Sequence, residues 1–166
     1  MKRFANFCPN CGTALVLRDR HGRERPVCEA CGHIVYFDPK VAVIAVVIQD
    51  ERVLLVQRAM NPGMGKWACP AGFVEYDEAP TDAVLRELKE ETNLDGKIEG
   101  LIEVFPKKDD GLADIVIAYR VSITGGNLEA GDDADNADWF TRDSLPELVF
   151  YPSITLIGER WRNGVL

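Results

Sequence analysis

Residues 72–94 read GFVEYDEAPTDAVLRELKEETNL, and this segment constrains the chain more than any other. Pro80 suits the first position of a helix, so we predict a helix over residues 81–92. At 100° per residue, three acids of this helix fall within an arc of about 100°, and an apolar stripe lies beside them. The acids are Glu87, Glu90 and Glu91, and the stripe contains Val84, Leu85, Leu88 and Thr92.

This acidic arc points to a cation site. Like charges three or four residues apart on a helix repel each other, and no lysine stands four residues beyond any of these acids to relieve the repulsion. Hard cations such as Mg²⁺ or Mn²⁺ prefer oxygen ligands and would neutralise the acids. Taken alone, however, residues 86–91 would favour an ordinary acidic face in solvent.

The flanking sequence predicts a mixture of strands and helices. Residues 40–48 form a β-branched run long enough for a buried strand, and residues 52–58 read as its partner in a hairpin. The other expected elements are two extended pieces within 67–75 broken at Pro70 and Gly72, strands at 98–106, 112–123 and 139–140, an acidic loop at 129–138, and a helix at about 152–162 with Ile154, Ile157 and Trp161 on one face.

Four of the five cysteines form two pairs with metal-ligand spacing. The pairs Cys8/Cys11 and Cys28/Cys31 fit C-x2-C-x16-C-x2-C, and a glycine follows each pair. Residues 1–38 hold few large apolar side chains, so a bound Zn²⁺ would supply most of their folding free energy. The segment resembles a zinc ribbon with a structural role. The alternatives are two disulfides or four unrelated thiols, while Cys69 is expected to be a small buried hydrophobe.

Composition and charge exclude several classes of protein. The 166 residues have a net charge of -8, and no apolar run approaches the roughly 18 residues of a membrane span. No secretory signal is evident at the start, so we expect a cytoplasmic protein. Residues 1–38 carry six basic and four acidic side chains, which leaves 13 basic and 23 acidic ones beyond them. Such an acidic body disfavours binding to long nucleic acids and suits a protein that meets phosphates through cations.

Residues 72–94 resemble the signature of the Nudix hydrolases, G-x5-E-x7-R-E-U-x-E-E-x-G-U, in which U is apolar. Asn93 stands where the family has glycine, and Asn tolerates the left-handed backbone expected there better than other residues. Ala71 also stands where the family often has another glycine. The resemblance implies an α/β fold, a Nudix α/β/α sandwich with a mixed sheet at residues 39–166, preceded by the zinc ribbon at residues 1–38.

The resemblance also implies roles for the signature residues. Glu87 and Glu91 would bind Mg²⁺ or Mn²⁺, assisted by the Ala71 carbonyl. Glu90 would be a third ligand, directly or through water, and is a candidate general base. Arg86 and Glu78 would orient the acids. Some family members place the base on a later loop, where Asp133 is the next candidate and the others are Glu129, Asp132 and Asp135.

Two further residues are expected near the substrate. Glu75 can reach the metals or the diphosphate. Arg58, at the end of its predicted strand, could hold a terminal phosphate, or it could be an ordinary solvated strand end. The resemblance implies hydrolysis of a nucleoside diphosphate linked to another group at its pyrophosphate bond. It also makes a homodimer the expected assembly.

The fold and the signature do not specify the substrate. The zinc-ribbon NADH pyrophosphatases usually carry S-Q-P-W-P-F-P-x-S downstream, and this chain has no such segment. A group resembling plant FAD and ADP-ribose pyrophosphatases fits better, because it has a segment similar to residues 145–154. FAD or ADP-ribose is therefore the leading substrate, giving AMP plus FMN or ribose 5-phosphate. NADH and dinucleoside polyphosphates are alternatives.

The alternative to an enzyme is a non-catalytic regulator that senses nucleotides and whose signature residues are inert. Arg18, Arg20, Arg23 and Arg25 cluster in the ribbon and could contact nucleic acid or a partner. Four thiolates with one Zn²⁺ carry -2, however, and cancel the ribbon's +2. Sensors of this kind also tend to lose signature carboxylates, and none is lost here, so hydrolysis is the favoured prediction.

Overall fold

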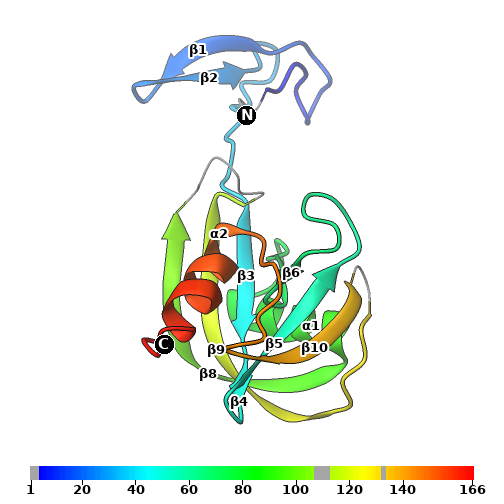
Figure 1. The fold of residues 1–166 in the computed structure, drawn as a ribbon. Helices are drawn as coiled ribbons and strands as arrows, with labels where there is room; N and C mark the ends of the chain where they lie inside the picture. Colours follow the sequence, from blue (N-terminus) through cyan, green and yellow to red (C-terminus); the bar gives the residue numbers. More distant parts are fainter. Residues whose placement is uncertain (1–3, 107–112, 132–133) are drawn as a thin grey trace. The chain divides into compact units, whose positions relative to one another are not determined.

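The computed structural model describes residues 4–106, 113–131 and 134–166. The chain divides into two compact units, Met1–Asp38 and Pro39–Leu166, which are described separately below (Figure 1). Within the described residues, no helix is both long and apolar enough to cross a membrane.

The N-terminal unit is built on one antiparallel hairpin. Strand β1 (Val16–Arg20) pairs with β2 (Arg23–Val27), and the two residues between them have positive φ, as a tight turn requires. The two cysteine pairs form turns that resemble each other. The amide of Gly12 donates to the Cys8 carbonyl and that of Gly32 donates to the Cys28 carbonyl, both at 2.9 Å. Both glycines have φ above +70°, a conformation that side chains disfavour.

A mixed four-stranded sheet organises the C-terminal unit. Its order is β7-β3-β9-β8, in which β3 and β9 are parallel and the outer pairings are antiparallel. The strands are β3 (Val41–Val46), β7 (Ala71–Phe73), β8 (Leu94–Pro106) and β9 (Ile115–Gly126). Gly72 therefore lies within a strand and does not break one. Leu112, the expected start of the fourth of these strands, lies outside the described residues.

The second sheet contains β10 (Ala134–Thr141), β5 (Arg52–Arg58), β4 (Ile48–Gln49) and β6 (Trp67–Ala68), with β5 paired to all three others. The predicted hairpin between residues 40–48 and 52–58 was therefore wrong in its main pairing. Only β4 pairs with β5, because the chain leaves the first sheet after β3. Strand β10 also begins earlier than expected and occupies part of the predicted acidic loop.

Two helical segments cover the sheets. Helix α1 (Pro80–Thr92) starts at Pro80 and ends at Asn93, whose φ of 58° confirms the expected left-handed residue. The last segment starts as a short helix, α2 (Tyr151–Ser153), and continues as a π-helix, η1 (Ile154–Trp161). The wider π-helical turn changes which residues share a face. Ile157 and Trp161 are buried, whereas Ile154 is 39% exposed, so the three residues predicted to share one face differ in their burial.

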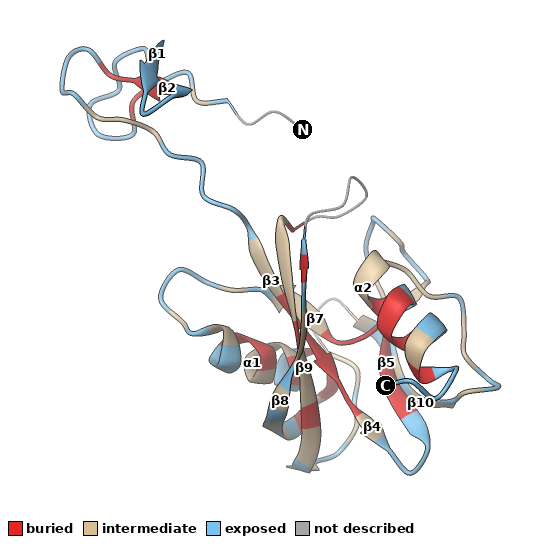
Figure 2. Ribbon diagram, turned by 90° about the vertical axis from the view of Figure 1, so that its left-hand side faces the viewer, coloured by how far each residue is buried: buried red, intermediate tan, exposed pale blue. Residues whose placement is uncertain are grey.

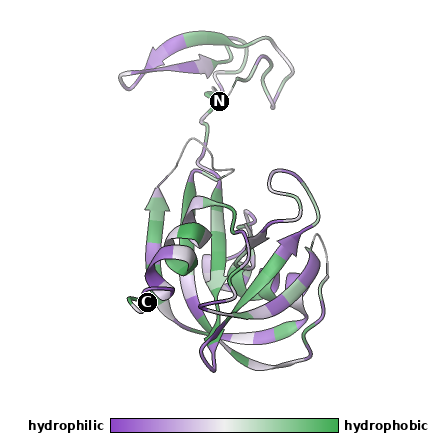
Figure 3. Cartoon of the chain, viewed as in Figure 1, coloured by the Kyte–Doolittle hydropathy of each residue, from purple (hydrophilic) through white to green (hydrophobic). Residues whose placement is uncertain are grey.

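Strand β3 explains why both faces of the sheet are covered. Its residues alternate between two apolar clusters: Val43 and Ala45 pack with α1, and Ile44 and Val46 pack with η1. Figure 2 shows buried residues along β3 and β5 and on parts of both helical segments, and Figure 3 shows β3 as largely hydrophobic. Such a run, apolar on both faces, is typical of a strand inside an α/β/α sandwich, the fold class expected from the sequence.

Candidate active site and zinc centre

The four ribbon cysteines converge on one point. Their ligand atoms all lie within 4.8 Å of one another, and three of the Sγ···Sγ separations are 3.4 to 3.6 Å. A tetrahedral zinc ion with Zn–S bonds of about 2.3 Å requires sulfurs about 3.8 Å apart. None of the five cysteines is joined in a disulfide. The cluster is consistent with a structural zinc site formed by Cys8, Cys11, Cys28 and Cys31.

Arg86 is the centre of the hydrogen-bond network at the acidic face of α1. Its Nε and Nη2 atoms donate to the two carboxylate oxygens of Glu78 at 3.1 and 2.6 Å, and Nη2 also donates to the Phe73 carbonyl at 3.0 Å. Its Nη1 donates to both Glu87 and Glu90 at 2.8 Å. Arg86 therefore lies among the acids and offsets their repulsion, which the sequence argument had treated as unrelieved.

Arg86 strongly lowers the pKa of Glu78. Two hydrogen bonds from Arg86, assisted by one from the Glu75 amide at 2.9 Å, lower the pKa of Glu78 to about 2. Hydrogen bonds to Glu78, Glu87 and Glu90 raise the pKa of Arg86 above its ordinary value. The pair therefore stays charged throughout the physiological range and ties the loop before α1 to the middle of the helix.

Glu87 lies directly against the backbone of Gly72. A Cβ atom placed on Gly72 would fall 1.9 Å from the Glu87 carboxyl carbon, far inside any allowed contact. The carboxylate can therefore occupy its position only because residue 72 has no side chain. This close approach is the physical reason for the glycine that begins the signature.

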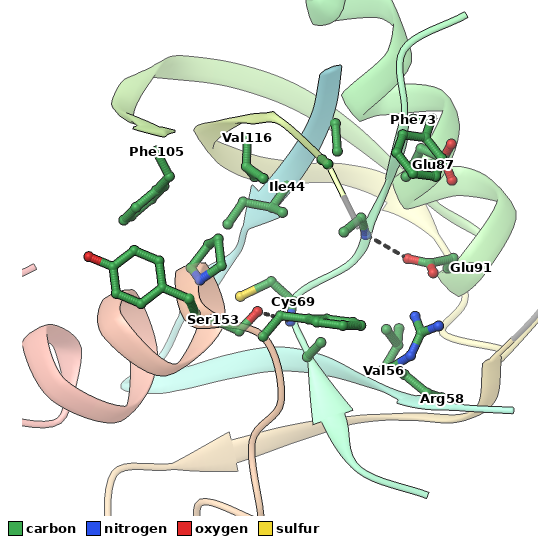
Figure 4. A pocket seen from close by; sticks show the side chains of 18 of the residues that line it. Ile44, Val56, Arg58, Cys69, Phe73, Glu87, Glu91, Phe105, Val116 and Ser153 are labelled. Atoms are coloured by element: carbon green, nitrogen blue, oxygen red, sulfur yellow. Dashed lines mark hydrogen bonds between the residues drawn. The ribbon is translucent and has the colours of Figure 1, made fainter. Parts of the chain in front are cut away.

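Glu91 and Glu90 have different environments. Glu91 is 3% exposed, and its Oε2 accepts a hydrogen bond from the Ala71 amide at 2.8 Å (Figure 4). Glu90 has a side chain that is 44% exposed and turned toward Arg86. Among the described residues, the three acids do not form a cluster as tight as that of the cysteines. The helix thus presents one buried and one exposed carboxylate beside Glu87.

A cavity of about 440 Å³ lies beside this helix. Glu75, Glu87 and Glu91 line it together with Arg58 from β5, so five of the predicted residues, counting Ala71, come together there. Figure 4 shows Glu87, Glu91 and Arg58 near one end and Phe105 at the other. Glu78, Arg86 and Glu90 are not among the lining residues, and Asp133 lies outside the part of the chain that the structure describes.

The apolar side of this cavity was not predicted from the sequence. Phe105, Val116 and Ile44 line it from the first sheet, while Phe150 and Tyr151 approach from the segment before η1. The rings of Phe105 and Tyr151 meet edge to face with centroids 5.6 Å apart. In the sequence, residues 145–154 were notable only because they resemble a segment of the FAD and ADP-ribose pyrophosphatase group. No local pattern indicates that these residues face the acids.

Cys69 confirms its expected role as a small buried side chain. It is 1% exposed at the edge of the cavity, and its backbone amide donates to Ser153 Oγ at 3.1 Å (Figure 4). Burial raises the pKa of the Cys69 thiol to about 12, so the side chain stays neutral and is a poor nucleophile.

Comparison with known proteins accounts for nearly the whole chain. The NUDIX domain family matches residues 38–155, and the family described as Nudix N-terminal, a zinc ribbon, matches residues 6–37. An ADP-ribose pyrophosphatase from Methanocaldococcus jannaschii is 41% identical over 133 residues, which cover 78% of this chain and 79% of the relative.

Two further proteins are similar to most of this chain. An NAD-capped RNA hydrolase NudC from Chromobacterium violaceum is 30% identical over 151 residues; the match covers 89% of this chain but only 54% of that relative. The crystal structure of a NUDIX hydrolase from Nitrosomonas europaea superposes with a TM-score of 0.86 at 28% identity, covering 96% of this chain and 91% of the other.

Proposed function

Because this chain belongs to the Nudix hydrolase family, whose members act as pyrophosphatases on nucleotide-type substrates, we propose that its substrate is ADP-ribose. Hydrolysis at the pyrophosphate bond would give AMP and ribose 5-phosphate. The observation that carries the proposal is the 41% identity to a protein named as an ADP-ribose pyrophosphatase. FAD was the other leading expectation from the sequence. It does not occur in the name of any relative described above, so the test compares FAD with ADP-ribose.

The cavity supports a substrate with a charged part and an apolar part. Its acidic end suits a diphosphate bound through cations, because three carboxylates there would otherwise repel it. Its other end is lined by aromatic and β-branched side chains, which suit a nucleobase. A volume of about 440 Å³ lies within the usual range for small-molecule sites.

Nudix enzymes typically use divalent metals, and the donors here fit hard cations. Glu87 and Glu91 present carboxylate oxygens to the cavity, and we propose them as ligands of Mg²⁺ or Mn²⁺ together with the Ala71 carbonyl and, directly or through water, Glu90. Bound cations would offset the diphosphate charge and lower the pKa of a coordinated water. The protein's own part is to hold the carboxylates, through Arg86 and the Ala71 amide.

A carboxylate must also accept the proton of the attacking water. We propose Glu90 for this role, with Asp133 as the second candidate. The side chain of Glu90 is 44% exposed, but it must loosen its 2.8 Å contact with Arg86 to act. In this scheme Arg86 and Glu78 orient the acids and do not touch the substrate.

Product analysis tests the substrate. The protein is incubated with Mg²⁺ or Mn²⁺ and, at matched concentrations, with ADP-ribose, FAD, NADH, a diadenosine polyphosphate or ATP, and the products are separated by chromatography. We expect AMP and ribose 5-phosphate in equal amounts, with ADP-ribose turned over fastest. Faster cleavage of FAD or NADH would reassign the substrate, and release of pyrophosphate from ATP as the main reaction would contradict the proposal.

A matched pair of variants tests the site and excludes a contaminating hydrolase. Glu91→Gln keeps an oxygen acceptor for the Ala71 amide but removes one charge at the cavity, so we expect activity to fall by about a hundredfold or more with the fold retained. Asp82→Asn makes the same chemical change on the exposed side of the same helix and should be neutral. Equal loss in both variants, or no loss in Glu91→Gln, would contradict the assignment of Glu91. Complete absence of hydrolysis in the unmodified protein would favour the sensor alternative.

A further inference from the structure

Arg58 is positioned at the cavity by two contacts. Its Nε donates to the Pro62 carbonyl at 2.9 Å, and its guanidinium lies 4.9 Å from the centroid of the Phe150 ring. Both Arg58 and Phe150 line the cavity, and Arg58 is the only Lys or Arg among the described lining residues. Within the described residues, its two Nη atoms donate to no acceptor in the protein. The outer edge of the guanidinium is therefore available to a ligand.

Phe150 holds its position with an unfavourable backbone conformation. Its φ of 64° and ψ of 132° lie in a region that residues with a side chain rarely occupy. The backbone is fixed on both sides: the Val149 amide donates to the Trp67 carbonyl at 2.9 Å, and the Phe150 carbonyl accepts from the Ile154 amide at 3.0 Å. The tertiary structure thus forces an unfavourable conformation at a residue whose ring supports a cavity arginine.

We propose that Phe150 is a positioning residue for Arg58, and that Arg58 binds phosphate oxygens of the substrate's diphosphate. The inference rests on the proposed function only in taking the ligand to be a diphosphate. Carboxylates of α1 and Arg58 of β5 lie near the same end of the cavity (Figure 4), so a diphosphate bound there can meet acid-bound cations on one side and the guanidinium on the other. The hydrogen bond from Nε and the ring contact of the guanidinium face leave the Nη edge of Arg58 available to an anion. An arginine already held in this way loses less side-chain entropy on binding than a mobile one.

The test measures ADP binding by calorimetry in the presence of Mg²⁺, since ADP carries the diphosphate but not the second half of a dinucleotide. Phe150→Leu should weaken ADP binding by about tenfold, and Phe150→Tyr, which keeps an aromatic face, should restore it. Arg58→Lys should weaken binding at least as much. Combined with Arg58→Lys, Phe150→Leu should cause little further loss, because Phe150 acts through Arg58.

Controls separate positioning from folding. Phe140→Leu removes a ring from β10 that packs on Trp67 but does not line the cavity, so it should lower thermal stability without changing ADP affinity. If Phe150→Leu does not fold, Phe150→Met, which keeps apolar bulk without an aromatic face, replaces it. Unchanged ADP binding in a folded Phe150 variant, unchanged binding in Arg58→Lys, or no ADP binding by the unmodified protein would overturn the inference. ADP-ribose hydrolysis is scored separately, so a wrong substrate leaves the ADP result decisive.

Discussion

Gly72 and Glu87 show how a single missing side chain can shape the site. The glycine lies in β7 and the glutamate on α1, and the carboxylate fills the space that a Cβ atom would need. The atoms that would clash belong to the end of a flexible side chain. A substitution at residue 72 should therefore move Glu87 and leave the packing of the helix largely intact.

Gly72→Ala should accordingly reduce turnover by about a hundredfold, because a displacement of about 1 Å in a positioned group can have that effect. The melting temperature should change little. Steady-state kinetics and thermal unfolding of the same preparation check both statements.

Gly100→Ala is the matched control. Gly100 lies in β8, has an ordinary φ, and has no atom within 4 Å of the added Cβ, so this variant should behave like the unmodified protein. If Gly72→Ala retained full activity, Glu87 would not need its observed position for the reaction.

At the scale of elements, the loop before α1 and the helix itself form one unit through Glu78 and Arg86. This ion pair is partly shielded, with side chains 16% and 32% exposed, and it orients the arginine that contacts Glu87 and Glu90. The position of the acids therefore depends on a residue in the preceding loop. An isolated helix of the same sequence would lack this restraint.

The depressed pKa of Glu78 predicts a specific pH dependence of stability. A carboxyl whose pKa falls from about 4.5 to about 2 on folding stabilises the protein above pH 4.5, and this contribution is lost as pH falls through 2. Glu78→Gln should thus be less stable than the unmodified protein at pH 7, and the difference should shrink between pH 4.5 and 2. Denaturant unfolding at several pH values measures it; a difference independent of pH would contradict the role of the ion pair.

At the scale of the whole molecule, the two units are stabilised in different ways. The Pro39–Leu166 unit contains both large apolar clusters, whereas the described residues of the Met1–Asp38 unit bury only Pro26, Val27 and two cysteines as apolar side chains. A unit with so little apolar core needs another source of folding free energy. The four converging thiols provide one if they bind zinc.

Cys28→Ser should release zinc and unfold the N-terminal unit while the C-terminal unit keeps its fold. Cys28 is fully buried, so its loss removes both a ligand and a central contact. Elemental analysis should fall from about one zinc per chain to none, and hydrogen exchange should rise only in residues 4–38.

Cys69→Ser provides the control for the loss of a thiol. Cys69 lies in the other unit, so zinc content should stay unchanged in that variant. Absence of zinc from the unmodified protein purified without chelators would contradict the prediction for Cys28. The expected homodimer and cytoplasmic location remain predictions.

The sequence by itself determined the parts of this protein that depend on local spacing. Helix α1 and its end at Asn93, the two cysteine pairs and the buried strand β3 follow from periodicity, backbone preference and ligand spacing, all of which act within a few residues. The resemblance to the family signature extended these local rules to an α/β/α sandwich, and the cysteine spacing predicted the zinc ribbon that precedes it in the sequence.

Only the tertiary structure decided which distant residues meet. Strand β3 pairs with β9 and not with β5, η1 adopts a π-helical turn, and Phe150 contacts Arg58 although 92 positions separate them in the sequence. Such pairings depend on the total packing of both sheets and both helical segments, so no local pattern encodes them. For the same reason Arg86, a surface residue by helical periodicity alone, becomes the centre of the acidic site once the loop carrying Glu78 folds against it.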